Sequence, residues 1–346
     1  MLRRKKNSYK VPIKRKIISF LCLFYTISFS SFLFLFYGPI TSFKEFWITS
    51  AMTTMNHQYL ATYLYSEEYI QKVLQSNRII EPNEVSNPDE IQFRHYTTTI
   101  YRNEYEKEIL QKEEENDLYK LIPISGKGYQ GFLVAIYDPS RIYIATTSKL
   151  GITGESILTV SKRENAIIAM NAGGFYDPDW NSNGALPHGT VISNGKVVSD
   201  YDDANMGGGF IGFTNEDKLI LGNMSIEEAL DIGYRDAIEF GPYLIVNGKR
   251  SFIQGNGGWG IAPRSAIGQR KDGIVLFLVI NGRLASSIGA DMVDLTDIME
   301  RYGAYNAANL DGGSSSELVI NQEIINTPVA GGENGLRNMS TFWVVK

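Results

Sequence analysis

The sequence predicts an α+β fold: a strand-rich domain of mixed sheet with few helices over residues 121–346, preceded by a transmembrane helix and a helical spacer. Three observations support this prediction. Short runs rich in Val, Ile, Phe and Tyr are separated by glycine turns after residue 120. Only two segments of this half have a helical pattern. One long uncharged apolar stretch lies near the N-terminus.

The apolar stretch is a predicted membrane span. Residues 17–37 are 21 residues without a charged side chain, close to the roughly 20 that a helix needs to cross a bilayer. The eight basic side chains of residues 1–16 predict a cytoplasmic tail, so the rest of the chain is expected outside the cell membrane as a single-pass protein. A cleaved signal peptide is the alternative. It is disfavoured because the run exceeds the usual roughly 7–15 residues and no small-x-small cleavage site follows.

Charge and cysteine content exclude several classes of protein. After residue 16 the chain has 25 basic and 38 acidic side chains. A body this acidic is not expected to bind nucleic acid, because such binding needs patches of Lys and Arg. Any anionic ligand must therefore be held by a few local cations. The single cysteine, Cys22, lies in the apolar stretch, so the outer part has neither a disulfide nor a thiolate nucleophile.

Residues 38–120 are predicted to be a helical and polar spacer. Large apolar side chains recur there every three or four residues, which predicts a helix with an apolar stripe: Phe46, Trp47, Met52, Met55, Tyr59, Tyr63, Leu64, Ile70, Val73 and Leu74. Pro82 and Pro88 interrupt the pattern, and an acidic stretch follows at 113–117. The stripe is expected to pack either on the domain beyond it or on another copy of itself.

Residues 121–346 carry the strand pattern. Seven segments are predicted strands: FLVAIYD, IYIATTS, AIIAMN, TVIS, KVVS, IVLFLVI and TFWVVK. Asn194-Gly195, Asn247-Gly248 and Asn281-Gly282 stand between apolar runs and predict hairpin turns. A capping-box pattern predicts a helix that begins after Ser225, and a second helix is predicted over residues 293–302.

Two further segments have weaker functional interpretations. Residues 126–131 match GxGxxG, but a strand follows where a dinucleotide site needs a helix, so they are interpreted as a loop entering the domain. Asp177, Asp179, Asn181 and Asn183 alternate as calcium ligands can, yet positions 182 and 188 lack the Gly and Glu of an EF-hand loop. An ordinary Asx-rich loop is favoured. The sequence requires no cofactor, and a divalent cation such as calcium at Asp177 and Asp179 is the alternative.

The three histidines, His57, His95 and His188, are too scattered in the sequence to predict a zinc site. His57 falls in the spacer and His95 in the polar stretch after it. His188 lies in a loop beside other candidate polar groups, and both a site role and an ordinary loop position are open for it.

Three polar residues beside glycine turns predict one site for an anionic sugar. Asp311 ends a short apolar strand before the Gly312-Gly313 turn, whose backbone N–H groups can face an anion. Asn171 ends another strand, and Arg264 begins a third. A carboxylate, an amide and a guanidinium together suit a sugar that carries an anionic group, although each segment alone also fits an ordinary tight turn. Neighbouring binding candidates are Gly173 and Ser314.

Six segments, in this order, resemble the phosphodiester glycosidase family: NAGGFYD, LPHGTVISNGK, FGPYLIVNGK, APRSAIGQRKDG, GRLASSIGA and NAANLDGGSSSELVI. The resemblance covers residues 125–346, and NLDGGSSS and PRSAIG are its most specific parts. That family includes the enzyme that uncovers mannose 6-phosphate by removing N-acetylglucosamine from its phosphodiester. The resemblance implies cleavage of the bond between a sugar's anomeric carbon and a phosphate. The spacer also resembles the one in membrane-anchored bacterial members.

The candidate residues are compatible with the chemistry that this resemblance implies. A phosphate monoester is a good leaving group, so charge stabilisation matters more than general-acid help. Arg264 is expected to hold the phosphate through a bidentate pair, assisted by the N–H groups of the Gly312-Gly313 turn. Asp311 is the expected base or nucleophile. Further expected roles are the orienting of sugar and phosphate by Asn171 and His188, and a second candidate carboxylate at Glu239.

Three functional classes fit these residues. The first is a hydrolase acting outside the cytoplasm on a surface glycan or related glycoconjugate that carries a sugar-1-phosphodiester. The second is a non-catalytic surface module that binds phosphate-bearing glycans in the same pocket. The third is a glycan-assembly transferase. Released reducing sugar, retention without release, and a glycosylated acceptor distinguish the three.

Overall fold

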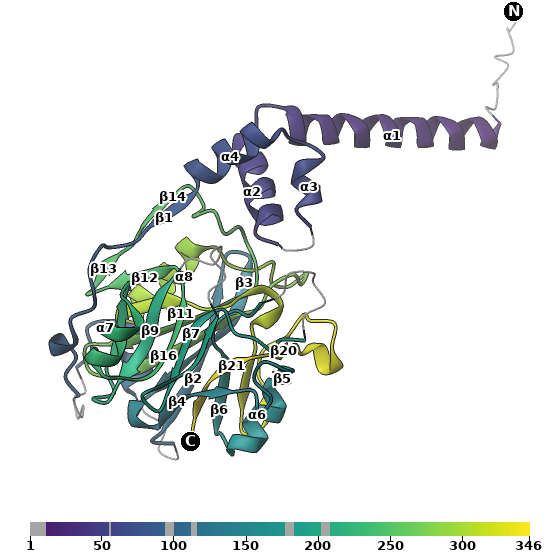
Figure 1. The fold of residues 1–346 in the computed structure, drawn as a ribbon. Helices are drawn as coiled ribbons and strands as arrows, with labels where there is room; N and C mark the ends of the chain where they lie inside the picture. The colour runs from purple at the N-terminus through teal and green to yellow at the C-terminus, as the bar shows by residue number, and fades with distance from the viewer. Residues whose placement is uncertain (1–11, 55–56, 94–99, 112–115, 177–182, 202–207) are drawn as a thin grey trace, which may run out of the picture.

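The computed structural model describes residues 12–54, 57–93, 100–111, 116–176, 183–201 and 208–346. It confirms the strand-rich α+β class (Figure 1). The long helix α1 (Ile13–Tyr37) projects from the rest of the molecule. The short helices α2 (Thr41–Met52), α3 (Tyr59–Thr62) and α4 (Glu67–Ser76) lie between its inner end and a strand-rich body.

The N-terminal helix α1 (Ile13–Tyr37) contains the predicted span, and it is long and apolar enough to cross a membrane. Three short helices follow: α2 (Thr41–Met52), α3 (Tyr59–Thr62) and α4 (Glu67–Ser76). Members of the predicted apolar stripe pack between these helices, where Ile70 and Val73 are buried with Ile48. Helix α2 also contacts the body. The spacer helices therefore pack on one another within one chain and on the domain beyond them.

Three large sheets form the body, and every strand pairing among the described residues is antiparallel. The 7-stranded sheet has the order β13 (Lys249–Arg250), β12 (Tyr243–Val246), β17 (Ala304–Asn309), β15 (Arg264–Arg270), β16 (Val275–Ile280), β3 (Tyr129–Ile136), β2 (Tyr119–Gly126). One 5-stranded sheet has the order β19 (Glu323–Ile324), β18 (Leu318–Ile320), β6 (Ile168–Asn171), β21 (Thr341–Val345), β4 (Ile142–Thr146). The other has the order β10 (Leu219–Gly222), β9 (Gly209–Thr214), β11 (Tyr234–Phe240), β7 (Gly189–Ser193), β8 (Lys196–Tyr201).

Smaller elements complete the body. Strand β1 (Arg78–Ile80) pairs with β14 (Phe252–Gln254), which joins the spacer to the body, and β5 (Glu155–Ser156) pairs with β20 (Asn338–Met339). The remaining helices are α5 (Glu104–Leu110), α6 (Ile157–Glu164), α7 (Ile226–Ile232) and α8 (Met292–Arg301). The short 3₁₀ turns are η1 (Pro88–Glu90), η2 (Pro139–Arg141), η3 (Gly313–Ser315) and η4 (Glu333–Gly335).

The main core lies where the three large sheets face one another. Inward side chains of all three sheets share one buried cluster, including Phe277, Trp343 and Phe213. Fully burying a large apolar side chain stabilises a fold by roughly 1.5–3 kcal/mol. Helix α8 covers the other face of the 7-stranded sheet, with Leu295 and Ile298 in a second cluster. The sheets are therefore rigid supports for the loops at their ends.

Two of the three predicted Asn-Gly hairpins are confirmed. Asn194-Gly195 joins β7 to β8 and Asn247-Gly248 joins β12 to β13, each with positive φ at both residues, as a type I′ turn requires. The third prediction is wrong, because neither residue of Asn281-Gly282 has a positive φ. The Asn281 side chain instead accepts a hydrogen bond from the Thr327 N–H at 2.8 Å. Gly282 packs against Pro263, where a side chain would not fit.

Both predicted helices are confirmed as α7 and α8, but the prediction that this half has only two is wrong. Helix α7 begins with the predicted capping box of Ser225, and α8 begins after the N-cap Asp291. The third helix, α6, has only eight residues between its N-cap Ser156 and the left-handed Asn165. Residues 126–131 form a hairpin rather than a loop entering the domain, because Gly126 ends β2, Gly128 lies in the turn and Gly131 lies in β3.

Candidate active site

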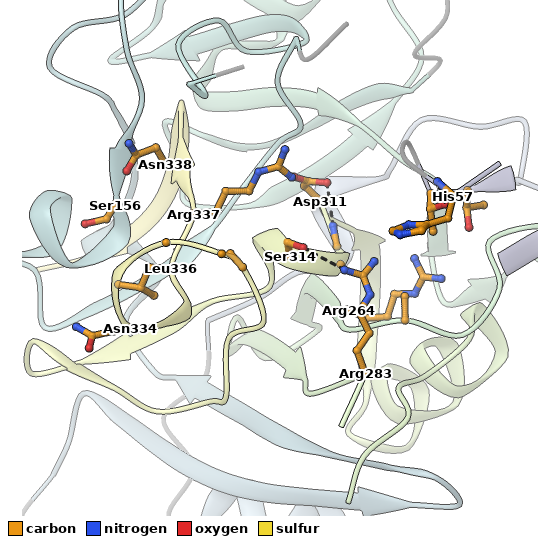
Figure 2. A pocket seen from close by; sticks show the side chains of 18 of the residues that line it. His57, Ser156, Arg264, Arg283, Asp311, Ser314, Asn334, Leu336, Arg337 and Asn338 are labelled. Atoms are coloured by element: carbon orange, nitrogen blue, oxygen red, sulfur yellow. Dashed lines mark hydrogen bonds between the residues drawn. The ribbon is translucent and has the colours of Figure 1, made fainter. Parts of the chain in front are cut away.

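A cavity of about 1350 Å³ lies where the spacer helices meet the strand-rich body. One wall is formed by the end of α2 and the start of the segment after it: Ser50, Met52, Thr53, Thr54, His57 and Gln58. The opposite wall comes from the body, mainly from helix α6 and from loops around β15, β16, β17 and β20. Figure 2 shows that Asp311, Arg264, Arg283 and Arg337 lie around this shared space. Asp311 and three guanidinium groups therefore line one cavity of an acidic body.

Asp311 is fixed by its main chain just after β17. Its N–H donates to the Ala172 carbonyl at 3.1 Å, and its own carbonyl accepts from Asn171 Nδ2 at 2.6 Å. The Gly312 N–H donates to Asp311 Oδ1 at 3.0 Å. These bonds link the end of β17 to β6 and hold the carboxylate at the cavity lining. The prediction that Asp311 and Arg264 share one cavity is confirmed.

Asn171 lies behind the cavity rather than in its lining. The residue is fully buried in β6. Its Oδ1 accepts from Ser265 Oγ at 2.7 Å and from the Glu317 N–H at 3.2 Å. The amide thus joins three strand ends and positions Asp311 from beneath. Both polar atoms of the amide already bond to the protein, and its expected role in orienting sugar and phosphate stays a prediction.

Arg264 begins β15 and is 4% exposed. Its Nε donates to the Ala290 carbonyl at 3.2 Å, and its Nη2 donates to the carbonyls of Trp259 and Gly260. Nη1 has no hydrogen bond among the described residues, and a Cβ placed on Gly312 would lie 3.6 Å from it. Burial lowers the pKa of Arg264 to about 10, so the group stays charged at neutral pH. Nε and Nη2 are thus occupied by backbone carbonyls, and the expected contact of Arg264 with a phosphate stays a prediction.

The glycine turn after Asp311 lines the cavity, but its backbone N–H groups are occupied. Gly312 N–H donates to the Asp311 carboxylate, and Gly313 N–H donates to the Pro263 carbonyl at 2.8 Å. This corrects the expectation that these two N–H groups face an anion. Ser314 also lines the cavity, and its Oγ accepts from Arg283 Nη1 at 3.0 Å.

Arg283 and Arg337 are cavity residues that the sequence reasoning did not single out. Burial lowers the pKa of Arg283, and the nearby positive charge of Arg337 lowers it further. The Arg337 guanidinium lies 4.4 Å from the centre of the Phe175 ring. The positive charges of Arg283 and Arg337 repel each other in one cavity, and a bound anion would relieve this repulsion. Arg283 falls in GRLASSIGA, which was the one signal in the sequence for it.

A second acid, Glu317, is buried next to the site. Its Oε1 accepts from the Arg337 backbone N–H at 2.7 Å, whereas its Oε2 is buried without a hydrogen bond among the described residues. Burial raises the pKa of Glu317 to about 8, which leaves this group protonated at neutral pH. Burial also raises the pKa of Asp311, although the Ser315 hydroxyl and the Arg337 charge oppose that effect. Two carboxyl groups with different environments therefore lie six residues apart, Asp311 after β17 and Glu317 before β18.

The other predicted residues lie outside the cavity lining. Gly173 donates from its N–H to Thr341 Oγ1 at 3.1 Å, and His188 donates from its backbone N–H to the Gly174 carbonyl at 3.0 Å. Glu239 Oε2 accepts from the Thr190 N–H at 2.6 Å. The first contact links the segment after β6 to β21, the second joins the segments before β7 and after β6, and the third links β7 to β11. In contrast, the discounted His57 lines the cavity from the spacer side.

The predicted cation ligands Asp177 and Asp179 lie outside the described residues, as does His95. Within the part of the chain that the structure describes, no three His, Cys, Asp or Glu side chains gather closely enough to hold a metal ion.

Comparison with known families decides the relationship of this chain. The family model for phosphodiester glycosidase matches residues 164–346, more than half of the chain. The chain belongs to the phosphodiester glycosidase family. Four charged residues that line the cavity, Asp311, Arg264, Arg283 and Arg337, fall in the matched region. The cavity wall made by the spacer lies outside that region.

Two proteins illustrate the similarity of this chain to others. The SPbeta prophage-derived uncharacterized protein YomE of Bacillus subtilis (strain 168) is 32% identical over 197 residues, which are 55% of this chain. The chain covers only 29% of the length of that relative. The catalytic domain of zebrafish N-acetylglucosamine-1-phosphodiester alpha-N-acetylglucosaminidase, auto-inhibited by its pro-peptide, has a TM-score of 0.55 at 19% identity. That match covers 68% of this chain and 85% of the zebrafish domain, and it shows a shared fold.

Proposed function

We propose that this phosphodiester glycosidase is a membrane-held hydrolase that cleaves a sugar-1-phosphodiester in a surface glycan or related glycoconjugate. The observation that carries the proposal is the meeting of Asp311 with Arg264, Arg283 and Arg337 in one cavity. Guanidinium groups stabilise a phosphate as it gains charge. A carboxylate can act as base or nucleophile at the carbon bonded to that phosphate. A substrate that carries a phosphate on its anomeric carbon needs both.

The reaction requires only water and the substrate. Water adds its oxygen to the anomeric carbon, and the bond from that carbon to the phosphate oxygen breaks. The bonding electron pair leaves with the phosphate monoester, and the proton of the water goes to Asp311 or to solvent. Asp311 acts as base for this water, or as nucleophile in a first step that water then completes. Arg283, Arg337 and Nη1 of Arg264 stabilise the charge on the departing phosphate.

The N-terminal helix supports the proposed location. Helix α1 is suited to span a membrane, and the basic residues before it favour a cytoplasmic N-terminus. The domain then works outside the cytoplasm, on the cell surface.

An additional calcium ion at Asp177 and Asp179 is a separate prediction, and unchanged turnover after EDTA treatment would contradict it.

The bond named in the zebrafish enzyme, an N-acetylglucosamine-1-phosphodiester, suggests a test substrate, the methyl phosphodiester of N-acetylglucosamine 1-phosphate. The full chain in detergent should release N-acetylglucosamine from it. Asp311→Asn should lower kcat about a hundredfold or more, because the group that serves the anomeric carbon loses its charge. Asp231→Asn on the exposed side of α7 is the matched control and should leave turnover unchanged.

Each other outcome would contradict the proposal in a different way. Retention of the phosphodiester without release would make the protein a binding module. A glycosylated acceptor in place of free sugar would make it a transferase. Full turnover by Asp311→Asn would move the reaction away from this acid.

A further inference from the structure

Arg264 is held by the loop between β14 and β15. Its Nη2 donates to the carbonyls of Trp259 and Gly260, and both residues belong to that loop. Trp259 also lies beside the guanidinium, 5.9 Å from ring centre to Cζ. Nη1 can face the cavity only while this loop keeps its position. The placement of the cation therefore depends on what holds residues 254–260.

The spacer helices hold that loop through Asn256. Asn256 Nδ2 donates to Thr49 Oγ1 of α2 at 2.8 Å, and the Asn256 N–H donates to Oδ1 of Asn77, which ends α4, at 2.9 Å. Thr49 is fully buried and Asn77 is 3% exposed. We call Thr49, Asn77 and Asn256 the clamp. Buried side-chain bonds of this kind fix a loop because breaking them leaves polar groups unsatisfied.

The backbone of the loop fits closely against α2. Gly255, Gly257, Gly258 and Gly260 all have positive φ, a conformation that favours glycine. A Cβ on Gly260 would lie 2.6 Å from Ser50 Oγ and 2.7 Å from Ser50 Cα. The loop therefore follows a path that glycine permits and that brings its main chain against the helix.

The same helix supplies the second wall of the cavity. Ser50 of α2 and its C-cap Thr53 line it, and the Thr53 hydroxyl donates to the Trp259 carbonyl at 3.4 Å. Helix α2 begins at Thr41, directly after the short break that follows α1. The segment between the apolar helix and the body is thus a part of the cavity and not only a tether.

We propose that α2 and α4 are a positioning device of the active site, in which the clamp fixes the loop that places Arg264. This inference rests on the proposed function for the role of Arg264 itself. Thr49 and Asn77 act through Arg264 and are positioning residues. Loosening the clamp lets the loop move, and the guanidinium then loses the carbonyls that aim Nη1 at the substrate phosphate.

The test uses the full chain in detergent and two substitutions of one residue. Thr49→Val keeps the shape of the side chain and removes the acceptor for Asn256, whereas Thr49→Ser keeps the hydroxyl. With the methyl phosphodiester of N-acetylglucosamine 1-phosphate, Thr49→Val should lower kcat/KM about tenfold. Thr49→Ser should stay within about twofold of the wild type. If Thr49→Val fails to fold, Asn256→Ala on the loop itself takes its place.

Two further readouts separate positioning from a general loss of stability. In the Arg264→Lys background, Thr49→Val should cause no additional loss, because residues that act through one group are non-additive. Hydrogen exchange of the amides at 255–260 should become faster in Thr49→Val and not in Thr49→Ser. Equal kcat/KM for the two variants, additive losses, or unchanged exchange would overturn the inference. A rise in kcat/KM would also overturn it, since α2 would then be an inhibiting cover.

Failure of the proposed function gives a different result. A wild-type chain that releases no sugar contradicts the proposed hydrolase, while hydrogen exchange still decides whether the clamp holds the loop.

Discussion

Asn171 Nδ2 donates to the main-chain carbonyl of Asp311 at 2.6 Å, across 140 residues of sequence. The Oδ1 of the same amide accepts from Ser265 Oγ and the Glu317 N–H. One buried side chain therefore sets the relative positions of the strand ends that carry the acid and the arginine of the site. A reaction that depends on their geometry depends on this amide.

Asn171→Ala should destabilise the protein and lower its activity together. The substitution leaves the Asp311 carbonyl, the Ser265 hydroxyl and the Glu317 N–H without this partner in a buried place, which costs about 2–4 kcal/mol of unfolding free energy. Urea unfolding of the full chain in detergent measures that cost. Asn223→Ala, at an exposed asparagine, should change stability by less than about 0.5 kcal/mol. Equal stabilities of the two variants would show that the amide is not a structural link.

Glu317 should make the protein less stable as the pH rises. Its folded pKa of about 8 lies above the ordinary 4.5, so folding favours the protonated form. This contribution is fully present below pH 4.5 and is lost as pH rises through 8. The expected loss is a few kcal/mol, on the scale of about 1.4 kcal/mol for each pKa unit.

The matched comparison for this pH effect is Glu317→Gln against Glu323→Gln. Glutamine cannot ionise, so Glu317→Gln should flatten the fall in unfolding free energy between pH 5 and pH 9. Glu323 is exposed on the nearby strand β19, and its substitution should leave the fall intact. An unchanged pH dependence in Glu317→Gln would mean that another group causes it.

Arg283 should matter for holding the phosphate. Arg283→Ala removes a cation that lines the cavity and donates to Ser314. We expect KM for the sugar phosphodiester to rise about tenfold, because a charge-assisted contact is lost. Lys271→Ala is the control, since it removes an exposed cation that pairs with Glu90 and does not line the cavity. If both variants raise KM equally, the effect reflects net charge and not the site.

The acid limb of the pH profile should follow the pKa of Asp311. Burial raises the pKa of Asp311 above its ordinary value of 3.8, and the proposed base or nucleophile must be ionised. Activity should therefore fall as pH drops through this raised pKa. The positive charge of Arg337 lowers the pKa of Asp311, so Arg337→Gln should move the acid limb of kcat/KM to higher pH. An acid limb that stays at the same pH in Arg337→Gln would show that a group other than Asp311 titrates there.

The sequence was informative where the signals were local. Strand runs, the capping box of Ser225 and two of the Asn-Gly turns depend on neighbouring residues, and the structure confirms them. Asp311 and Arg264 could be identified as site candidates because each stands beside a glycine turn at a strand end. Asn281-Gly282 could not be assigned correctly, since its conformation is decided by Thr327 and Pro263, which are distant in sequence.

Tertiary packing decides the rest of the site. His57 comes from the spacer and Arg337 from near the end of the domain, yet both line the cavity. No local pattern marks either residue. The Gly313 N–H was expected to be open to a ligand, but it meets the Pro263 carbonyl from another loop. Local patterns also could not predict that α2 forms a wall of the cavity. Periodicity shows that a helix is amphipathic, but it does not show which element the helix packs against.

The proposed reaction breaks the bond between carbon and oxygen, and turnover in water enriched with the heavy oxygen isotope ¹⁸O tests that claim most directly. The full chain in detergent is supplied with the methyl phosphodiester of N-acetylglucosamine 1-phosphate, and both products are analysed by mass spectrometry as soon as they form. The account predicts the label on the anomeric hydroxyl of the released sugar and an unlabelled methyl phosphate. Label in the phosphate would mean that water attacks phosphorus, and it would contradict a glycosidase mechanism at Asp311.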